Sequence, residues 1–185
     1  MRLINVLILE LVIILHILLI RILNIIETLD KPTNGQVEIN DKNISTMTKD
    51  QLSLFRLKKI GFVFQDFNLL PPLTVMENIM LPLTLDNKSA SVMKIKAEQL
   101  MKDLGISHLA NNRIHEASGG EKQRIAIARA LINDPDIILA DEPTTNLDTK
   151  KFDFVMETFK ELATKGKMII IATHDERILN IADKV

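Results

Sequence analysis

Three short apolar runs constrain the fold of this chain more than any other feature. Each has four or five residues, and stretches with helical periodicity lie between them; the runs are 60–64, 137–140 and 168–172. Continuous apolar runs of this length are typical of strands buried on both faces of a parallel sheet. Their alternation with helices predicts an α/β domain. We expect helices at 48–57, 75–81, 92–104, 122–132 and 152–164, and a further strand at 36–39.

The composition limits the kinds of binding partner and metal or nucleotide site that the chain can have. A length of 185 residues predicts one domain, or one domain with a sub-domain. Lysine and arginine number 23 against 24 acidic residues, so the net charge is −1 and we predict no nucleic-acid partner. The absence of cysteine excludes disulfides and thiolate metal sites. The glycines are placed so that neither G-x-G-x-x-G nor the phosphate loop G-x-x-x-x-G-K-[ST] occurs.

The first 26 residues differ in composition from the rest, because nineteen of them are Ile, Leu or Val. We therefore separate an atypical apolar segment, 1–22, from a domain at 23–185. Three interpretations of the apolar stretch stay open: a buried helix or strand, an amphipathic helix at a membrane surface, and a membrane span. Its polar residues interrupt the run and fall within one arc of about 160° on a helix, which permits the amphipathic form.

An apolar strand that ends in two acids is the first candidate site element. Asp141 and Glu142 directly follow the run 137–140. Ligands of open parallel sheets bind beyond the carboxyl ends of the strands, so two carboxylates there can hold a divalent cation and activate a water molecule. The alternative is a solvated acidic turn with no function.

A serine and two glycines at a predicted helix start form the second element. The run Ala117-Ser118-Gly119-Gly120-Glu121 leads into the helix predicted at 122–132. A serine N-cap followed by glycines leaves backbone N–H groups exposed at the positive end of a helix, where anions bind. The same residues also begin ordinary helices.

Two polar residues follow the other apolar runs. Gln65 follows 60–64, where an amide can bind a metal, a water or a backbone group. His174 follows 168–172, where an imidazole can contact phosphate or orient a water; the alternative is that it caps the next helix.

The order and spacing of these elements resemble the ATP-binding cassette (ABC) family of ATPases. The elements are Gln65, Ser118-Gly119-Gly120-Glu121, Asp141-Glu142-Pro143, Asn146-Leu147-Asp148 and His174. Asp141 follows Gly120 by 21 residues (141 − 120), and Ser118 follows Gln65 by 53 (118 − 65). The resemblance covers about 23–185. It implies an α/β fold with a P-loop NTPase-like (RecA-like) core and a helical sub-domain at about 70–117.

The resemblance implies a set of roles in ATP hydrolysis. Gln65 would contact Mg²⁺ and the attacking water, and Asp141 would reach Mg²⁺ through water. Glu142 would act as the general base, and His174 would lie near the γ-phosphate. Phosphoryl transfer depends mainly on such positioning and charge stabilisation.

The resemblance also implies a head-to-tail dimer of nucleotide-binding subunits that encloses two ATP molecules. Ser118, Gly119 and Gly120, in one motif with Glu121, would cap the γ-phosphate of the ATP held by the partner. Asp148 would contact the opposite subunit.

One subgroup of the family is most similar in the segments around 27–35, 64–71 and 118–124. It serves lipoprotein release, macrolide efflux and resistance to bacitracin and other antimicrobial peptides. The resemblance therefore implies a peripheral subunit on the cytoplasmic face of the plasma membrane. It would couple ATP hydrolysis to export or release of a lipophilic or peptide substrate through a separate permease.

The chain departs from the family at the phosphate loop. The family's glycines, lysine and hydroxyl would fall at about Leu18-Leu19-Ile20-Arg21, where none of those types is present. We hypothesise that 1 to about 22 replace the family's own N-terminus, through a shifted reading frame, a rearrangement or gene decay, and we expect a fold incomplete at both ends. One alternative function is a non-hydrolysing partner that donates its signature motif, Ser118-Gly119-Gly120-Glu121, to another subunit. Another is a degenerate ABC protein without its own ATP site. A cassette of DNA repair or translation is a third, which the 53-residue spacing (118 − 65) disfavours.

Overall fold

The computed structural model describes residues 24–26, 28–40, 42–145 and 147–184. The chain divides into two compact units, Met1–Arg56 and Leu57–Val185, and each is described by itself. The predicted boundary between 22 and 23 and the interpretations of 1–22 lie outside the described residues. In the part of the chain that is described, no helix is long and apolar enough to cross a membrane.

The first unit contains a small antiparallel hairpin. Strand β1 (Glu38–Ile39) pairs with β2 (Lys42–Asn43), and the 3-10 helix η1 (Ile44–Thr46) follows. The predicted strand at 36–39 is therefore shorter than expected. The N–H of Val37 donates to Ser45 Oγ, and the carbonyl of Val37 accepts from the N–H of Ile44, so this backbone pairs with η1 instead of with a strand.

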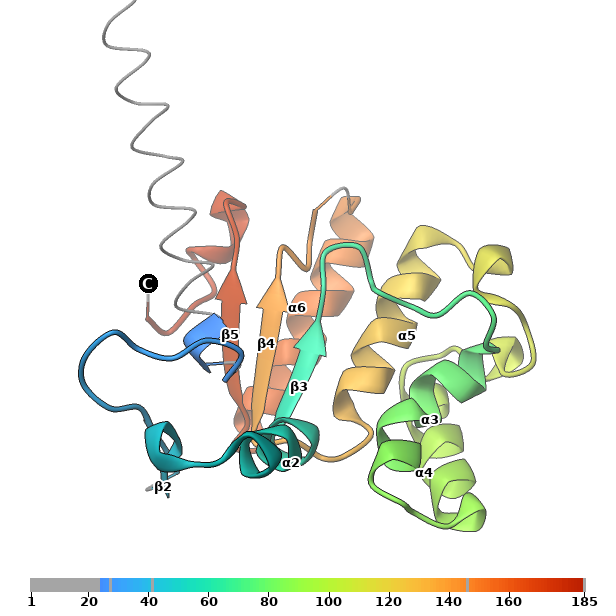
Figure 1. The fold of residues 1–185 in the computed structure, drawn as a ribbon. Coiled ribbons are helices and arrows are strands. Elements are labelled where there is room, and N and C mark those ends of the chain that lie inside the picture. The colour runs from blue at the N-terminus through green and yellow to red at the C-terminus, as the bar shows by residue number, and fades with distance from the viewer. Residues whose placement is uncertain (1–23, 27, 41, 146, 185) are drawn as a thin grey trace, which may run out of the picture. The chain divides into compact units, whose positions relative to one another are not determined.

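The second unit is built on a three-stranded parallel sheet with the order β3-β4-β5. The strands are β3 (Ile60–Val63), β4 (Ile137–Asp141) and β5 (Met168–Ala172). All three run in one direction, so their carboxyl ends lie along one edge (Figure 1). The three predicted strands are confirmed, because continuous apolar runs between helices leave few alternatives to a buried parallel sheet.

Helices connect the strands of this unit. They are α3 (Val75–Leu85), α4 (Ala90–Asp103), α5 (Gly119–Leu131) and α6 (Thr149–Thr164), while α2 (Lys49–Lys59) crosses from the first unit into the second. Helices α3 and α4 lie beside α5, on the side away from the sheet (Figure 1). Helix α5 approaches β3 so closely that any side chain at Gly61 would collide with the carbonyl of Ala130.

One apolar core joins these elements. Alternate β4 residues, Ile138 and Ala140, pack into it together with Ile125 of α5 and Val155 of α6, and all four are at most 2% exposed. This alternation is the period-two pattern of a strand, and the helices contribute the matching apolar faces. The sheet edge that carries the polar residues is thereby anchored on a packed core.

All five predicted helices are present, but their bounds differ from expectation. Helix α3 continues past Leu81 through Pro82, because Leu83 is completely buried and its packing offsets the cost of proline in a helix. Helices α5 and α6 begin three residues earlier than predicted, since Ser118 and Asp148 cap their first turns.

Candidate functional site

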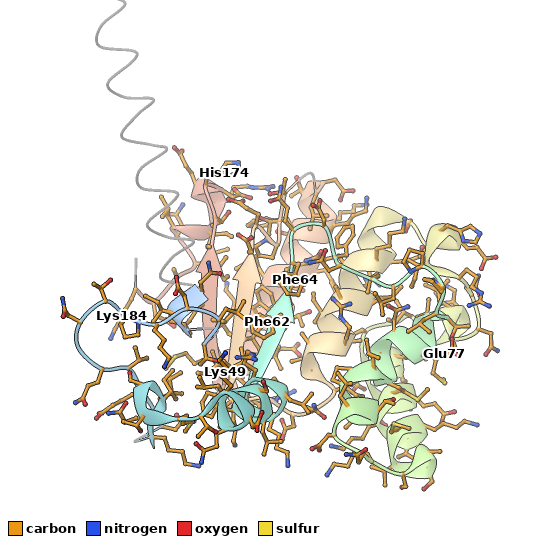
Figure 2. The ribbon with its side chains drawn as sticks, in the orientation of Figure 1. Lys49, Phe62, Phe64, Glu77, His174 and Lys184 are labelled. Atoms are coloured by element: carbon orange, nitrogen blue, oxygen red, sulfur yellow. The ribbon has the colours of Figure 1, made fainter. Side chains whose placement is uncertain are left out.

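The sheet brings four of the predicted site residues to one edge. Asp141 ends β4 and pairs in register with Ala172, the last residue of β5. Glu142 follows Asp141, Gln65 stands two residues beyond β3, and His174 two residues beyond β5. Figure 2 shows His174 at the carboxyl end of its strand. The parallel pairing of the three strands therefore brings these four positions to one edge of the sheet.

The carboxylate of Glu142 is buried and held by hydrogen bonds from three residues. Its Oε2 accepts from Thr145 Oγ1 at 3.1 Å and from Thr173 Oγ1 at 3.0 Å. Its Oε1 accepts from the backbone N–H of His174 at 3.0 Å and lies 2.7 Å from His174 Nδ1. The residue is 8% exposed and has a left-handed φ of 45°. A non-glycine residue in that conformation is held by its surroundings, so the direction of this carboxylate is fixed.

The imidazole of His174 lies at the surface, with 83% of its side chain exposed. Packing therefore does not fix its position, and the hydrogen bond to Glu142 does. The neighbouring Asp175, not His174, caps the short helix η4 (Glu176–Ile178) by accepting from the N–H of Arg177. The alternative role of His174 as a helix cap is thus wrong.

The predicted signature motif forms a capped helix start. Ser118 and Glu121 make a reciprocal capping box, in which Ser118 Oγ donates to Glu121 Oε2 at 2.6 Å and the N–H of Ser118 donates to the same oxygen at 2.8 Å. The hydrogen bonds from Ser118 hold the pKa of the Glu121 carboxyl below its usual range, and His108 adds to this at 3.4 Å. A side chain added at Gly119 would meet open space. Gly119 therefore leaves the backbone uncovered at the positive end of the α5 dipole, where the Glu121 carboxylate also lies.

A lysine connects the start of α5 to the start of α6. Lys151 Nζ pairs with Asp148 Oδ2 at 2.6 Å, and Asp148 caps α6 by accepting from the N–H of Lys151 at 3.1 Å. The hydrogen bonds from Lys151 lower the pKa of Asp148. The methylene groups of the same lysine cover Gly120, where an added Cβ would lie 2.9 Å from Cδ of Lys151. Two motifs that are 28 residues apart (148 − 120) thus share one side chain.

The loop after Gln65 is held in place by hydrogen bonds from a side chain of α5. Arg129 donates from Nη1 to the carbonyl of Asn68 at 2.5 Å and from Nη2 to the carbonyl of Phe67 at 2.7 Å. Phe67 and Asn68 both have left-handed φ values, 61° and 46°. Among the described residues no hydrogen bond is made by the exposed side-chain amide of Gln65, so it is available to a ligand.

Metal binding by protein groups alone is not supported in the described part of the chain, because no group of three His, Asp or Glu side chains could hold an ion. A site with only one or two protein oxygens fits Mg²⁺ bound to a nucleotide, because that ion completes its coordination shell with phosphate oxygens and water. Asp141 and Gln65, at the ends of neighbouring strands, are residues of that kind.

Sequence reasoning missed the residues that support the site. Thr145 and Thr173 hold the Glu142 carboxylate, Gln123 Nε2 donates to the carbonyl of Pro143 at 2.8 Å, and Arg177 holds Asp175. The only sequence signal for Thr173 and Thr145 is that each lies within three residues of a predicted site residue. Gln123 carried a weak signal, a polar residue on the apolar face of a predicted helix.

Comparison with known proteins places the chain in a family. Residues 21–145 match the family described as ABC transporter. The chain is 50% identical over 155 residues to the ABC transporter ATP-binding protein YxdL of Bacillus subtilis, with 83% of this chain and 60% of YxdL covered. It is 41% identical over 164 residues to the lipoprotein-releasing system ATP-binding protein LolD of Bacteroides fragilis, with 88% of this chain and 76% of LolD covered.

Solved structures show the same fold. The ATP-binding cassette MJ0796, in a dimeric post-hydrolysis state bound to ADP and Pi, superposes with a TM-score of 0.79 at 41% identity, covering 88% of this chain and 72% of that one. The fold is therefore that of P-loop NTPase cassettes, as predicted. The chain spans 60% and 64% of the length of two relatives, YxdL and YvcR of Bacillus subtilis.

Proposed function

Since this chain belongs to the ABC transporter family, we propose that it is an ATP-binding subunit that couples ATP hydrolysis to export or release of a substrate through a separate permease. The observation that carries the proposal is the contact between the buried Glu142 carboxylate and His174 Nδ1, 2.7 Å apart beyond adjacent strands. In the proposed reaction Glu142 would accept a proton from the attacking water, and His174 would contact the γ-phosphate.

ATP and Mg²⁺ are the cofactors of the proposed reaction. Mg²⁺ would neutralise charge on the phosphates, with Asp141 and Gln65 as its protein-side contacts. Thr145 and Thr173 hold Oε2 of Glu142, and the backbone N–H and ring Nδ1 of His174 contact Oε1, so the direction of the carboxylate that would act as the base is fixed. Ser118, Gly119, Gly120 and Glu121 would face the γ-phosphate held by a second cassette, and the polarity of the α5 start supports binding of an anion there.

The partners of the proposed function are a second nucleotide-binding subunit and a transmembrane permease. LolD and the macrolide export protein MacB are among the relatives of the chain, which supports a lipophilic or peptide antibiotic-like substrate. We place the subunit on the cytoplasmic face of the plasma membrane as a peripheral protein.

A second candidate function rests on one observation, the absence of any G-x-x-x-x-G-K-[ST] loop from the sequence. Backbone N–H groups and a lysine of that loop normally hold the phosphates. A chain without them can still donate the surface around Gly119 to an intact cassette. In that case it completes the partner's ATP site and hydrolyses nothing itself.

Two variants separate these functions. Glu142→Gln removes the general base, and Gly119→Asp places a negative charge in open space on the proposed phosphate-facing surface. Gly119→Asn is the matched neutral control. Calorimetry measures binding of Mg-ATP to the chain alone, and phosphate release measures hydrolysis. Sedimentation of the labelled chain measures its association with a cassette that has an intact phosphate loop.

The first function predicts that the chain binds Mg-ATP alone and that Glu142→Gln lowers hydrolysis at least about 100-fold. The second predicts no binding alone, no effect of Glu142→Gln, and ATP-dependent association that Gly119→Asp abolishes and Gly119→Asn preserves. Absence of both ATP binding and association would overturn both functions.

A further inference from the structure

The exposed position of His174 requires an explanation. A side chain that is 83% exposed gains little from packing, yet its Nδ1 lies within 2.7 Å of the buried Glu142. The loop that carries it, 173–175, must therefore be fixed through its neighbours. Thr173 is fixed on one side, because its hydroxyl donates to Glu142 Oε2 at 3.0 Å.

Asp175 fixes the loop on the other side. Its Oδ2 accepts from Thr144 Oγ1 at 2.9 Å, and its N–H donates to Thr173 Oγ1 at 3.0 Å. Arg177 supplies the strongest contacts: Nη2 lies 2.6 Å from Oδ2, and Nε lies 2.9 Å from Oδ1. A guanidinium that meets both carboxylate oxygens restricts the direction of the carboxylate as well as its position.

Arg177 is itself held by a ring from another element. Its Cζ lies 4.1 Å above the centroid of Phe152, which is 5% exposed and belongs to the first turns of α6. Helix α6 begins at its cap Asp148, the residue expected to meet a second subunit. Phe152, Arg177 and Asp175 thus form a continuous set of contacts from the start of α6 to the loop of His174.

We infer that Arg177 is a positioning residue, which holds the loop 173–175 against Phe152 and thereby keeps His174 on Glu142. The inference deepens the proposed function and rests on it for its meaning in catalysis. The contacts themselves exist in the chain without nucleotide, so they can be tested without activity. Nothing in the local sequence requires an arginine two residues after Asp175 for the short helix η4, because Asp175 caps it through the backbone N–H of that residue.

Hydrogen exchange tests the positioning directly. The backbone N–H of His174 donates to Glu142, so its exchange reports whether the loop is in place. We compare Arg177→Met, which keeps an unbranched side chain and loses the charge, with Phe152→Leu, which keeps an apolar side chain and loses the ring. Arg177→Lys retains a cation without the planar fork, and Lys160→Met on the exposed face of α6 is the control.

The quantity measured is the exchange rate of the loop 173–175 divided by that of β4 in the same molecule. We expect Arg177→Met and Phe152→Leu to raise this ratio about tenfold, Arg177→Lys to raise it less, and Lys160→Met to leave it unchanged. If the ratio is unchanged in both Arg177→Met and Phe152→Leu, the inference is overturned. This includes the case in which the loop and β4 exchange faster by the same factor, because the whole unit is then destabilised. Absence of both ATP binding and association, with exchange ratios that change in the variants as expected, would instead count against the proposed functions alone.

Discussion

His174 Nδ1 and Glu142 Oε1 lie 2.7 Å apart, although 32 residues (174 − 142) separate them in the chain. The contact joins an exposed imidazole to a buried carboxylate whose second oxygen is occupied by two threonine hydroxyls. The backbone N–H of His174 donates to the same Oε1 at 3.0 Å, so both oxygens of the carboxylate have partners. These contacts together fix the direction of the carboxylate, and the imidazole extends the site to the surface.

The ion pair of Asp175 makes stability depend on pH. Hydrogen bonds from Arg177, and secondarily from Thr144, hold the pKa of Asp175 well below its ordinary value. The unfolded chain therefore takes up a proton near pH 4, while the folded chain does so only at lower pH. The stability gained from Asp175 is full above about pH 5 and is lost progressively as the pH falls through the unfolded pKa toward the lower folded pKa.

We expect Asp175→Asn to lower the free energy of unfolding at pH 7 by about 1–2 kcal/mol. The difference between the native chain and the variant should shrink as urea titrations are repeated from pH 5 down to pH 2.5. A difference that stays constant over this range would contradict the assigned cause.

The buried amide of Gln123 supports the turn after Glu142. Its Nε2 donates to the carbonyl of Pro143 at 2.8 Å, and the residue is 3% exposed. Gln123→Met keeps the volume but leaves that carbonyl without its donor, which should cost about 1–3 kcal/mol of unfolding free energy in urea. Gln99→Met, on the exposed face of α4, is the control and should change stability little. Equal effects of the two substitutions would refute the role of the buried bond.

Arg129 holds the loop after Gln65 by two hydrogen bonds to the carbonyls of Phe67 and Asn68. Burial lowers the pKa of its guanidinium, which nevertheless stays charged at neutral pH. We expect Arg129→Met to release the loop, so that limited proteolysis cuts within 65–70 about tenfold faster. Arg129→Lys should give an intermediate rate, because it retains one donor to the carbonyls. Cleavage at the native rate in Arg129→Met would rule out this role.

A double-mutant cycle can measure the interaction free energy between the Lys151 side chain and a side chain placed at position 120. Gly120→Ala alone places a methyl group against the lysine stem, so the helix-propensity gain of alanine is offset by displacement of that stem. In a Lys151→Ala background the methyl group has room, and Gly120→Ala should then stabilise the chain by about 0.5–1 kcal/mol in urea unfolding. Lys150→Ala replaces Lys151→Ala in the control cycle. Identical effects of Gly120→Ala in all backgrounds would show that the two residues do not interact.

The elements of the second unit could be predicted because their signals are local. The runs at 60–64, 137–140 and 168–172 predicted β3, β4 and β5 to within one residue. Helix starts were placed less well, since α5 and α6 begin at the residue after the caps Ser118 and Asp148, and capping depends on side-chain geometry. The passage of α3 through Pro82 was missed, because burial of Leu83 is a tertiary effect.

The sequence by itself determined which polar residues stand at the ends of the strands, because the periodicity of apolar residues sets where each strand stops. It therefore determined that Gln65, Asp141 and His174 stand at or just beyond the ends of strands, and the parallel pairing of the strands brings them to one edge. Only the tertiary structure decided which atoms meet there. The parallel register that pairs Asp141 with Ala172 carries the following loops toward one another, so Thr173 and His174 reach the carboxylate of Glu142. Contacts across 32 residues of chain (174 − 142) depend on strand register and core packing, neither of which leaves a local pattern in the sequence.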